Sequence, residues 1–292
     1  MRYAKLFSRR EIIRTGAFAS LTLPLLGAGS MPRRTAIAQV SANDDPWCGL
    51  KVGVASYTLR KMPLDAAIAS IRRLDLKYVS IKDFHLPMKS TRDERRAVAQ
   101  KFKEAGITPL SCGNVTMQND EANIRSAFEY ARDTGLPTIV CSPHPDSMPI
   151  LDRMVKEFNI RLAIHNHGPE DKRFPSPYDA WKAAEKFDRR IGLCIDVGHT
   201  ARAKVDPAEA IVKCRARLYD VHFKDIDSTE PTGKTVEAGR GVLNLDSVLR
   251  ALLKIKYSHL VSFEYEKDEN DPLPGLAETV GYTKALLRGA KA

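Results

Sequence analysis

Six of the seven histidines in this 292-residue chain lie just after a short apolar run of the kind that forms a buried strand. They are His85, His144, His165, His167, His199 and His222, whereas His259 precedes such a run. Asp196, Lys224, Glu264 and Glu266 follow apolar runs in the same way. If the runs are parallel strands of one closed barrel, their carboxyl ends form its catalytic face. This placement therefore predicts that the polar side chains gather at one mouth.

Three pairs of these polar residues are spaced two apart, so the members of a pair point to the same face of a strand. The pairs are His165 with His167, His222 with Lys224, and Glu264 with Glu266. Any one of these residues alone is compatible with a packing or surface role. Burying so many polar groups together without a ligand is costly, so the convergence predicts a ligand-binding site.

Four of the residues have the donor atoms that divalent transition metals prefer. Two imidazoles and two carboxylates from four different strands can surround one ion and leave positions open for a substrate. The predicted ligands of one divalent metal ion are His165, Asp196, His222 and Glu264. Manganese, zinc, cobalt and iron all suit this set, and the sequence does not choose among them. Magnesium suits it less well, because it favours oxygen ligands.

Eight strand-like runs alternate with helix-length segments along the chain, and this alternation is typical of a parallel α/β barrel. The runs are Lys51 to Ser56, Tyr78 to Ile81, Thr108 to Cys112, Thr138 to Ser142, Arg161 to Ile164, Gly192 to Ile195, Leu218 to Val221 and Leu260 to Phe263. An open doubly wound sheet would require a glycine-rich turn after the first strand, where Ser56-Tyr57-Thr58 stands instead. The predicted fold is a (β/α)8 TIM barrel, with residues 226 to 245 as an extended loop over the active face.

Four segments carry a family resemblance: AIHNHG (163–168), GLCIDVGHT (192–200), DVHFKD (220–225) and SFEYE (262–266). In this order they resemble the xylose isomerase-like superfamily of sugar isomerases and epimerases. The resemblance implies that Asp196, His222 and Glu264 bind metal. It also implies that His199 and Lys224 contact substrate, and that Arg240 in GRGVLN lies near the substrate.

One position departs from this family pattern. Many members have a glutamate, both metal ligand and acid/base, where this chain has His165. Without a pair of opposed carboxylates, a one-sided reaction such as isomerisation or β-elimination becomes more plausible than symmetric epimerisation. His165 can still bind the metal, but proton transfer then falls to other groups.

The chemistry expected of such a site is removal of a proton next to a sugar carbonyl, with the metal stabilising the developing negative charge. The candidate catalytic residues are Glu264, Glu266, His167 and Lys224, and the candidate substrate-binding residues are His199, Arg240, Lys82 and His85. The expected partner is a small carbohydrate: a non-phosphorylated ketose or aldose, an inosose or a 3-keto-glucoside. Two alternatives stay open, a lyase of 3-keto-glycosides and a periplasmic barrel that binds carbohydrate without catalysis.

The first 38 residues have the order of a twin-arginine export signal. Arg9-Arg10 precedes an uncharged apolar stretch over 17–30, and Ala36-Ile37-Ala38 forms a small-residue cleavage site. The stretch is shorter than the roughly 20 residues needed to span a bilayer, so a retained anchor is the less favoured alternative. The predicted organisation is a signal over 1–38, a linker over 39–50 and the barrel over 51–292, with the mature protein in the periplasm and no stable membrane span.

The formal net charge of +10 belongs largely to this leader, because removing its seven basic residues and one acidic residue leaves +4. The charge is thus weak support for a nucleic-acid partner, and an apurinic endonuclease is disfavoured. Cys112, Cys141 and Cys194 lie in apolar runs and are expected to pack as small hydrophobic residues, whereas a bridge between Cys48 and Cys214 stays open. The last predicted helix, 276–287, can close the barrel or pack against a second copy in a homo-oligomer.

Overall fold

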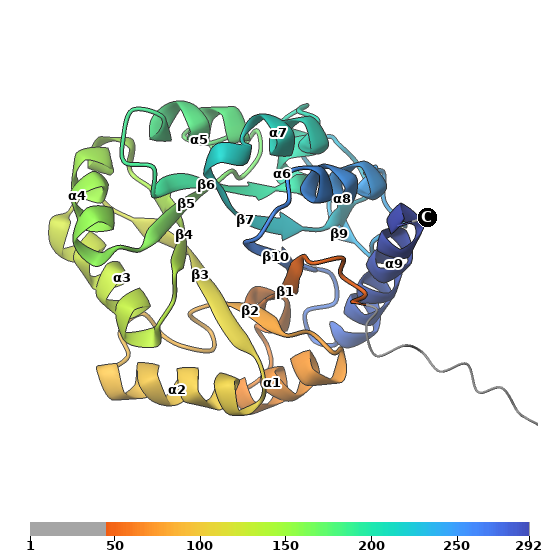
Figure 1. The fold of residues 1–292 in the computed structure, drawn as a ribbon, viewed down its shortest axis with the longest axis horizontal. Coiled ribbons are helices and arrows are strands. Elements are labelled where there is room, and N and C mark those ends of the chain that lie inside the picture. The colour runs from red at the N-terminus through yellow and green to blue at the C-terminus, as the bar shows by residue number, and fades with distance from the viewer. Residues whose placement is uncertain (1–44, 292) are drawn as a thin grey trace, which may run out of the picture. The chain divides into compact units, whose positions relative to one another are not determined.

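The computed structural model describes residues 45–291, so the predicted export signal lies outside the described residues. Eight parallel strands form a closed barrel in the order β1-β10-β7-β6-β5-β4-β3-β2. Helices surround the strands on the outside (Figure 1). The predicted (β/α)8 barrel is confirmed.

All eight predicted strands are present. Their bounds are β1 Lys51–Ala55, β2 Tyr78–Ile81, β3 Thr108–Met117, β4 Thr138–Pro143, β5 Arg161–His165, β6 Ile191–Asp196, β7 Leu218–Phe223 and β10 Leu260–Phe263. The largest difference is β3, which continues five residues beyond the predicted end at Cys112 to Met117. The apolar run stops at Cys112 because Gly113 and Asn114 follow it, and the pairing with β4 is irregular at the same place, between Cys112 and Val115.

The helices between the strands begin and end where local chemistry favours it. They are α1 Leu64–Arg73, α2 Arg92–Glu104, α3 Glu121–Thr134, α4 Met148–Phe158, α5 Pro177–Ala184, α6 Val197–Arg202, α7 Pro207–Lys213, α8 Leu245–Lys254 and α9 Leu273–Lys291. Thr91 and Glu94 form a capping box that satisfies backbone N–H groups at the start of α2. Gly135 adopts φ 77° and ends α3, as glycine does without steric cost. None of the described helices is long and apolar enough to cross a membrane.

The hydrophobic core lies between the outer face of the strands and the helices. Phe102 of α2, Phe128 of α3 and Leu252 of α8 are among the fully buried side chains that fill this layer. Cys112, Cys141 and Cys194 are buried in the barrel, as expected of packing residues. Cys214 is a buried free thiol, so the Cys48–Cys214 bridge is not formed.

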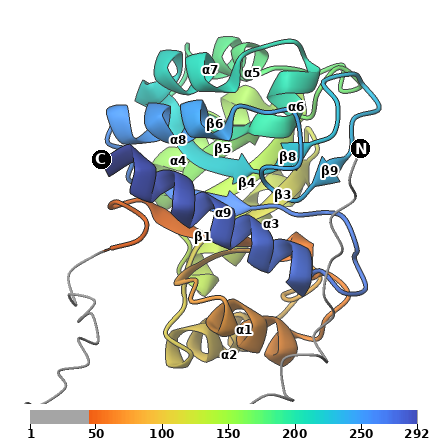
Figure 2. The same ribbon diagram turned by 90° about the vertical axis from the view of Figure 1, so that its right-hand side faces the viewer.

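The segment predicted as an extended loop contains a small antiparallel hairpin, formed by β8 (Asp225–Ile226) and β9 (Thr235–Val236). Figure 2 shows the hairpin close to α6 at the carboxyl end of the barrel. The buried Asp225 carboxylate holds the segment after β9, because Gly239 N donates to Oδ2 at 2.9 Å and Leu243 N to Oδ1 at 3.2 Å. These bonds fix the loop that borders the barrel mouth.

Candidate active site

The four predicted metal ligands come from four adjacent strands of the barrel. His165 is the last residue of β5, Asp196 is the last of β6, His222 lies in β7, and Glu264 directly follows β10. Asp196 also caps the following helix α6 by accepting a hydrogen bond from His199 N at 2.8 Å. Strand ends and a helix start therefore fix the direction of these side chains before any ligand binds.

These side chains face one another in the barrel interior, with one donor atom of each within 4.8 Å of the others. His165 Nε2 lies 3.0 Å from His222 Nδ1 and 3.5 Å from Asp196 Oδ2. His222 Nδ1 lies 3.9 Å from Asp196 Oδ2 and 3.1 Å from Glu264 Oε2. The structure thus brings together all four residues in one buried cluster.

This cluster fits a divalent metal ion. Ligands placed about 2.1 Å from a tetrahedral ion are separated by about 3.4 Å. The separations here run from 3.0 to 3.9 Å and bracket that value. Burial lowers the pKa of His165 well below its usual value, so its imidazole is neutral and has a lone pair available. Asp196 Oδ2 is fully buried, and its neighbours within 4 Å include His165 Nε2 and the Lys224 ammonium, so a negative charge on this atom already faces a cation inside the cluster.

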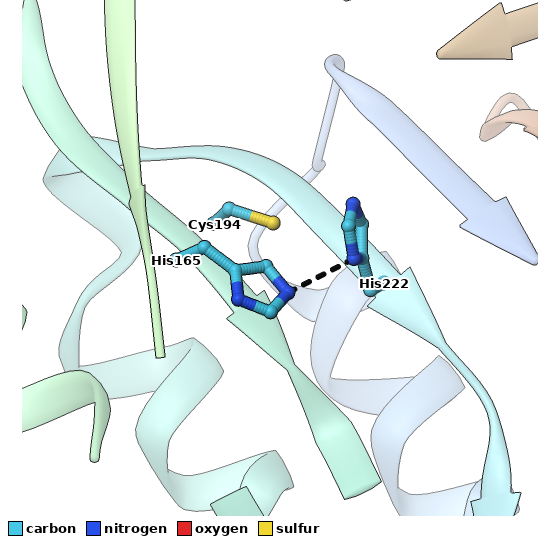
Figure 3. Close-up of side chains that lie close together, drawn as sticks. All are labelled: His165, Cys194 and His222. Carbon is cyan, nitrogen blue, oxygen red and sulfur yellow. Dashed lines mark hydrogen bonds between the residues drawn. The ribbon is translucent and has the colours of Figure 1, made fainter. Parts of the chain in front are cut away.

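A second group of possible ligands contains Cys194 in place of the carboxylates (Figure 3). The figure shows the Cys194 sulfur beside the His165 and His222 rings, which face each other through Nε2 and Nδ1. Burial raises the pKa of the Cys194 thiol well above its usual value, and the neighbouring carboxylates raise it further. The set with two carboxylates offers four ligand atoms against three and includes two negative charges, so it fits a divalent cation better.

Charges inside the cluster keep both carboxylates ionised. Burial alone would raise the pKa of Asp196, but the charges of His199 and Lys224 hold it well below its usual range. For Glu264 burial is likewise outweighed, by His222 and Lys224. The pKa of His222 is raised because Glu264 outweighs the effect of burial. A proton on His222 therefore competes with a metal ion for this site.

Lys224 provides the positive charge that the carboxylates require. Its ammonium group is buried and lies 3.0 Å from Asp196 Oδ2, 2.8 Å from Glu264 Oε2 and 2.5 Å from Glu266 Oε1. Burial lowers the pKa of Lys224, but the three carboxylates outweigh burial and raise it well above its usual value. Lys224 is therefore a permanent cation at the edge of the ligand set.

A cavity of about 240 Å³ opens over this cluster. Side chains from six strands or the segments after them line it: Tyr57, Lys82, Asn114, His165, His167, His199, Glu264 and Glu266. Its size suits a small ligand. His167 follows β5 and Glu266 follows β10, and β6 and β7 separate these two strands in the barrel. Two groups that can transfer protons therefore line the cavity from different sides.

His167 is held in one orientation by three residues that the sequence analysis did not identify. Asn114 Nδ2 lies 2.8 Å from Nε2 of the ring, while Asp171 Oδ2 and Ser142 Oγ lie 3.3 and 3.4 Å from Nδ1. An amide nitrogen can only donate, so Nε2 is the unprotonated nitrogen and Nδ1–H faces Asp171. A histidine oriented by a carboxylate is the arrangement of a general base.

Two of the predicted substrate-binding residues line the cavity, and two lie elsewhere. Lys82 and His199 line it. His85 is buried outside the lining, with Nδ1 3.0 Å from Ser56 Oγ and Nε2 3.1 Å from Met62 O, so both ring nitrogens have partners.

Arg240 is also absent from the lining of the cavity. Its guanidinium is 61% exposed and forms two hydrogen bonds to Glu278 of α9, at 2.5 and 2.7 Å. His144, another histidine at a strand end, caps the short helix over Pro145–Ser147. Neither Arg240 nor His144 lines the cavity.

Comparison with known proteins agrees with the fold. Residues 68–286 match the family model of the xylose isomerase-like TIM barrel. The rhizopine catabolism protein MocC of Rhizobium meliloti is 26% identical over 158 residues, which are 49% of this chain and 48% of that protein. The chain thus matches about half the length of this curated relative.

Solved structures share the fold at low sequence identity. The apo form of the 3-keto-D-glucoside 4-epimerase YcjR from E. coli has a TM-score of 0.67 and 15% identity, over 81% of this chain and 99% of that one. The IolI protein with a bound zinc atom has a TM-score of 0.69 and 16% identity, over 82% and 99% of the two chains.

Proposed function

Because the chain belongs to the xylose isomerase-like TIM-barrel family, we propose that it is a metal-dependent isomerase or epimerase of a non-phosphorylated keto sugar or inosose. The observation that carries this proposal is the buried set of two imidazoles and two carboxylates under a cavity with two groups able to transfer protons. The similarity to a zinc-containing barrel and to a keto-glucoside epimerase supports it.

The proposed metal site consists of His165, Asp196, His222 and Glu264. A divalent cation held there would stabilise the negative charge that develops on a substrate carbonyl oxygen after loss of the neighbouring proton. Lys224 keeps the two carboxylate ligands ionised. This charge balance lets the residues bind a cation without first losing protons from the carboxylates.

His167 is the proposed base on one side of the substrate. Burial lowers the pKa of His167, and Asp171 opposes this effect only in part, so the imidazole is neutral at pH 7. Its Nε2 is unprotonated and accepts a proton from the carbon next to the carbonyl. The Nδ1–H group keeps its own proton and continues to face the Asp171 carboxylate. Asn114, which donates to Nε2 in the free site, must release it when substrate enters.

Glu266 is the proposed proton donor and acceptor on the other side. Its carboxylate is 35% exposed and bound to Lys224, so it can exchange a proton with solvent. A base on each side would allow protonation on either face of the planar intermediate. His167 and Glu266 would thus take over the role of the glutamate that many family members have at position 165, and this pair is compatible with epimerisation as well as isomerisation.

A lyase that acts on 3-keto-glycosides is the second candidate. It begins with the same proton abstraction and then expels a substituent from the next carbon. A lyase is favoured by a second cavity, which shares Glu266 with the first cavity and has room for a leaving group. We further propose that the enzyme works in the periplasm, on the basis of the twin-arginine motif over 8–13.

Solvent deuterium exchange tests the proposal. The mature protein, loaded with manganese or zinc, is incubated in D₂O with ketoses, inososes and 3-keto-glucosides, and the α-proton signal is followed by NMR. The proposal expects loss of that signal with one sugar class, together with an isomer, an epimer or an eliminated product. Sugar binding without exchange for any member of the panel would instead support a binding barrel.

A further inference from the structure

A second cavity of about 360 Å³ adjoins the cavity over the metal ligands. His199 and Glu266 line both cavities, so one ligand can extend from the first into the second. Lys234 and Thr235 of the β8–β9 hairpin segment line the second cavity, and Gly198 of α6 lines it as well. The predicted substrate residues did not include this hairpin.

The lining of the second cavity has an excess of positive charge. Four cationic side chains line it, Arg202, Lys224, Lys234 and Lys267, against the single carboxylate of Glu266. That carboxylate is bound by the Lys224 ammonium at 2.5 Å. An anion in the cavity would therefore meet cations and no free carboxylate of the lining.

The acidic partners of these cations lie outside the lining. Arg202 is paired with Glu170 at 2.6 Å, and Lys267 with Glu237 at 2.9 Å. Lys234 is exposed, and no acidic side chain among residues 45–291 lies within ion-pair distance of it. Lys234 is thus available for an ionised ligand without first breaking an ion pair.

The two cavities differ in the kind of group that they suit. The first contains the ring of Tyr57, which offers a flat apolar surface to a sugar ring. No phenylalanine, tyrosine or tryptophan side chain of the described residues lines the second cavity, whose one ring is the imidazole of His199. Hydrogen bonds and charge are therefore the main means of recognition in the second cavity, and these favour an ionised oxygen group over a neutral ring.

The loop that forms part of the second cavity is already ordered. Asp225 accepts hydrogen bonds from Ile226 N at 2.9 Å and Gly241 N at 3.1 Å, and Asp227 accepts one from Lys234 N at 2.8 Å. The backbone of Lys234 is thus fixed near the cavity. Binding an anion there does not require the loop to fold first.

We infer that the second cavity binds an anionic substituent of the substrate, a carboxylate, while the sugar ring that reacts occupies the first cavity. A phosphate is the other source of the same charge, and a preference for it would replace the non-phosphorylated sugar proposed above by a phosphorylated one. This inference rests on the proposed function for the placement of the reacting ring. It specifies the substrate as a sugar that bears a charged group on its far side, rather than a free neutral monosaccharide.

Two matched ligand pairs test the inference by isothermal titration calorimetry on the metal-loaded protein at low ionic strength. The first pair is 4-carboxyphenyl and 4-carbamoylphenyl β-D-glucoside, which differ in charge and little in size. The second pair is glucose 1-phosphate and methyl glucoside. The charged member of at least one pair should bind about fivefold more tightly, the effect of one pair of unit charges about 4 Å apart in water. The ligand pair with the larger difference in affinity shows whether the second cavity prefers a carboxylate or a phosphate.

Lys234→Glu should abolish this preference without affecting the fold, because Lys234 is exposed. Lys182→Glu on α5 makes the same change in net charge away from the cavity and should retain the preference. Equal affinity for charged and neutral members in both pairs would overturn the inference. So would a preference that Lys234→Glu leaves intact.

The binding assay is independent of turnover. Loss of the preference with intact deuterium exchange would overturn only this inference, whereas an intact preference without exchange for any sugar would overturn only the proposed function.

Discussion

Replacing Lys224 by methionine removes the cation that balances three carboxylates. The Lys224 side chain is 2% exposed, and its ammonium lies within 3.0 Å of Asp196, Glu264 and Glu266. Methionine fills similar space but leaves the carboxylate of Asp196 buried without this partner. Removing one member of a buried ion pair costs about 3–5 kcal/mol, and we expect Lys224→Met to lower the free energy of unfolding of the metal-free protein by this amount.

A divalent cation would change this result, because it supplies positive charge to the same carboxylates. We therefore expect added manganese or zinc to restore at least about half of the lost stability in Lys224→Met, since metal binding to the folded state stabilises it. Urea unfolding at pH 7, with chelator and then with metal, measures both values.

Lys267→Met is the matched control. Lys267 is paired with the buried carboxylate of Glu237, at 2.9 and 3.1 Å, outside the predicted ligand set. This variant should also be destabilised, but metal should restore no more stability to it than to the wild type. Equal stability of Lys224→Met and the wild type in chelator, or equal rescue of both variants by metal, would refute the reasoning.

Three further predictions concern the base, the loop and pH. His167→Gln should reduce the rate of solvent deuterium exchange about 100-fold or more, the usual contribution of a general base. Asp171→Asn should reduce this rate less, and it should lower kcat rather than raise KM. Unchanged exchange in both variants would exclude His167 as the base. Asp225→Ala should lower the free energy of unfolding by roughly 3 kcal/mol, because it removes the acceptor of four backbone N–H donors, of which that of Ile226 is buried. Urea unfolding measures this loss, and a loss under about 1 kcal/mol would contradict the anchoring role. Burial, with smaller contributions from nearby cations, lowers the pKa of His259 to about 4. Between pH 6.5 and 4 the unfolded state therefore binds more protons than the folded state, and the free energy of unfolding decreases as the pH falls through this window. The melting temperature of His259→Gln should fall less over this range than that of the wild type, and parallel curves would contradict the prediction.

The barrel could be predicted from the sequence because a parallel strand buried on both sides is a continuous apolar run. All eight runs are strands of the barrel. The β8–β9 hairpin could not be found in this way, because each of its strands has only two residues. A single buried carboxylate, Asp225, holds much of that segment, and its partners are backbone groups without a sequence pattern.

The convergence of the four proposed metal ligands could be predicted because they lie at or near the ends of strands, whose positions follow from the fold. The partners of the His167 ring could not be predicted from the sequence, because Asn114 is 53 residues away and Asp171 lies in a loop. The ion pair of Arg240 could not be predicted from its motif. Its partner Glu278 is 38 residues away, and only the structure brings α9 beside it.

Metal dependence of the proton abstraction is tested by titrating metal-free protein with manganese or zinc while solvent deuterium exchange into the reactive sugar is measured. We expect no exchange without metal, a linear rise to a plateau at one equivalent per chain, and loss of both metal binding and exchange in His222→Ala. Exchange at full rate in chelator, or exchange unaffected by His222→Ala, would exclude a metal-dependent reaction at this site.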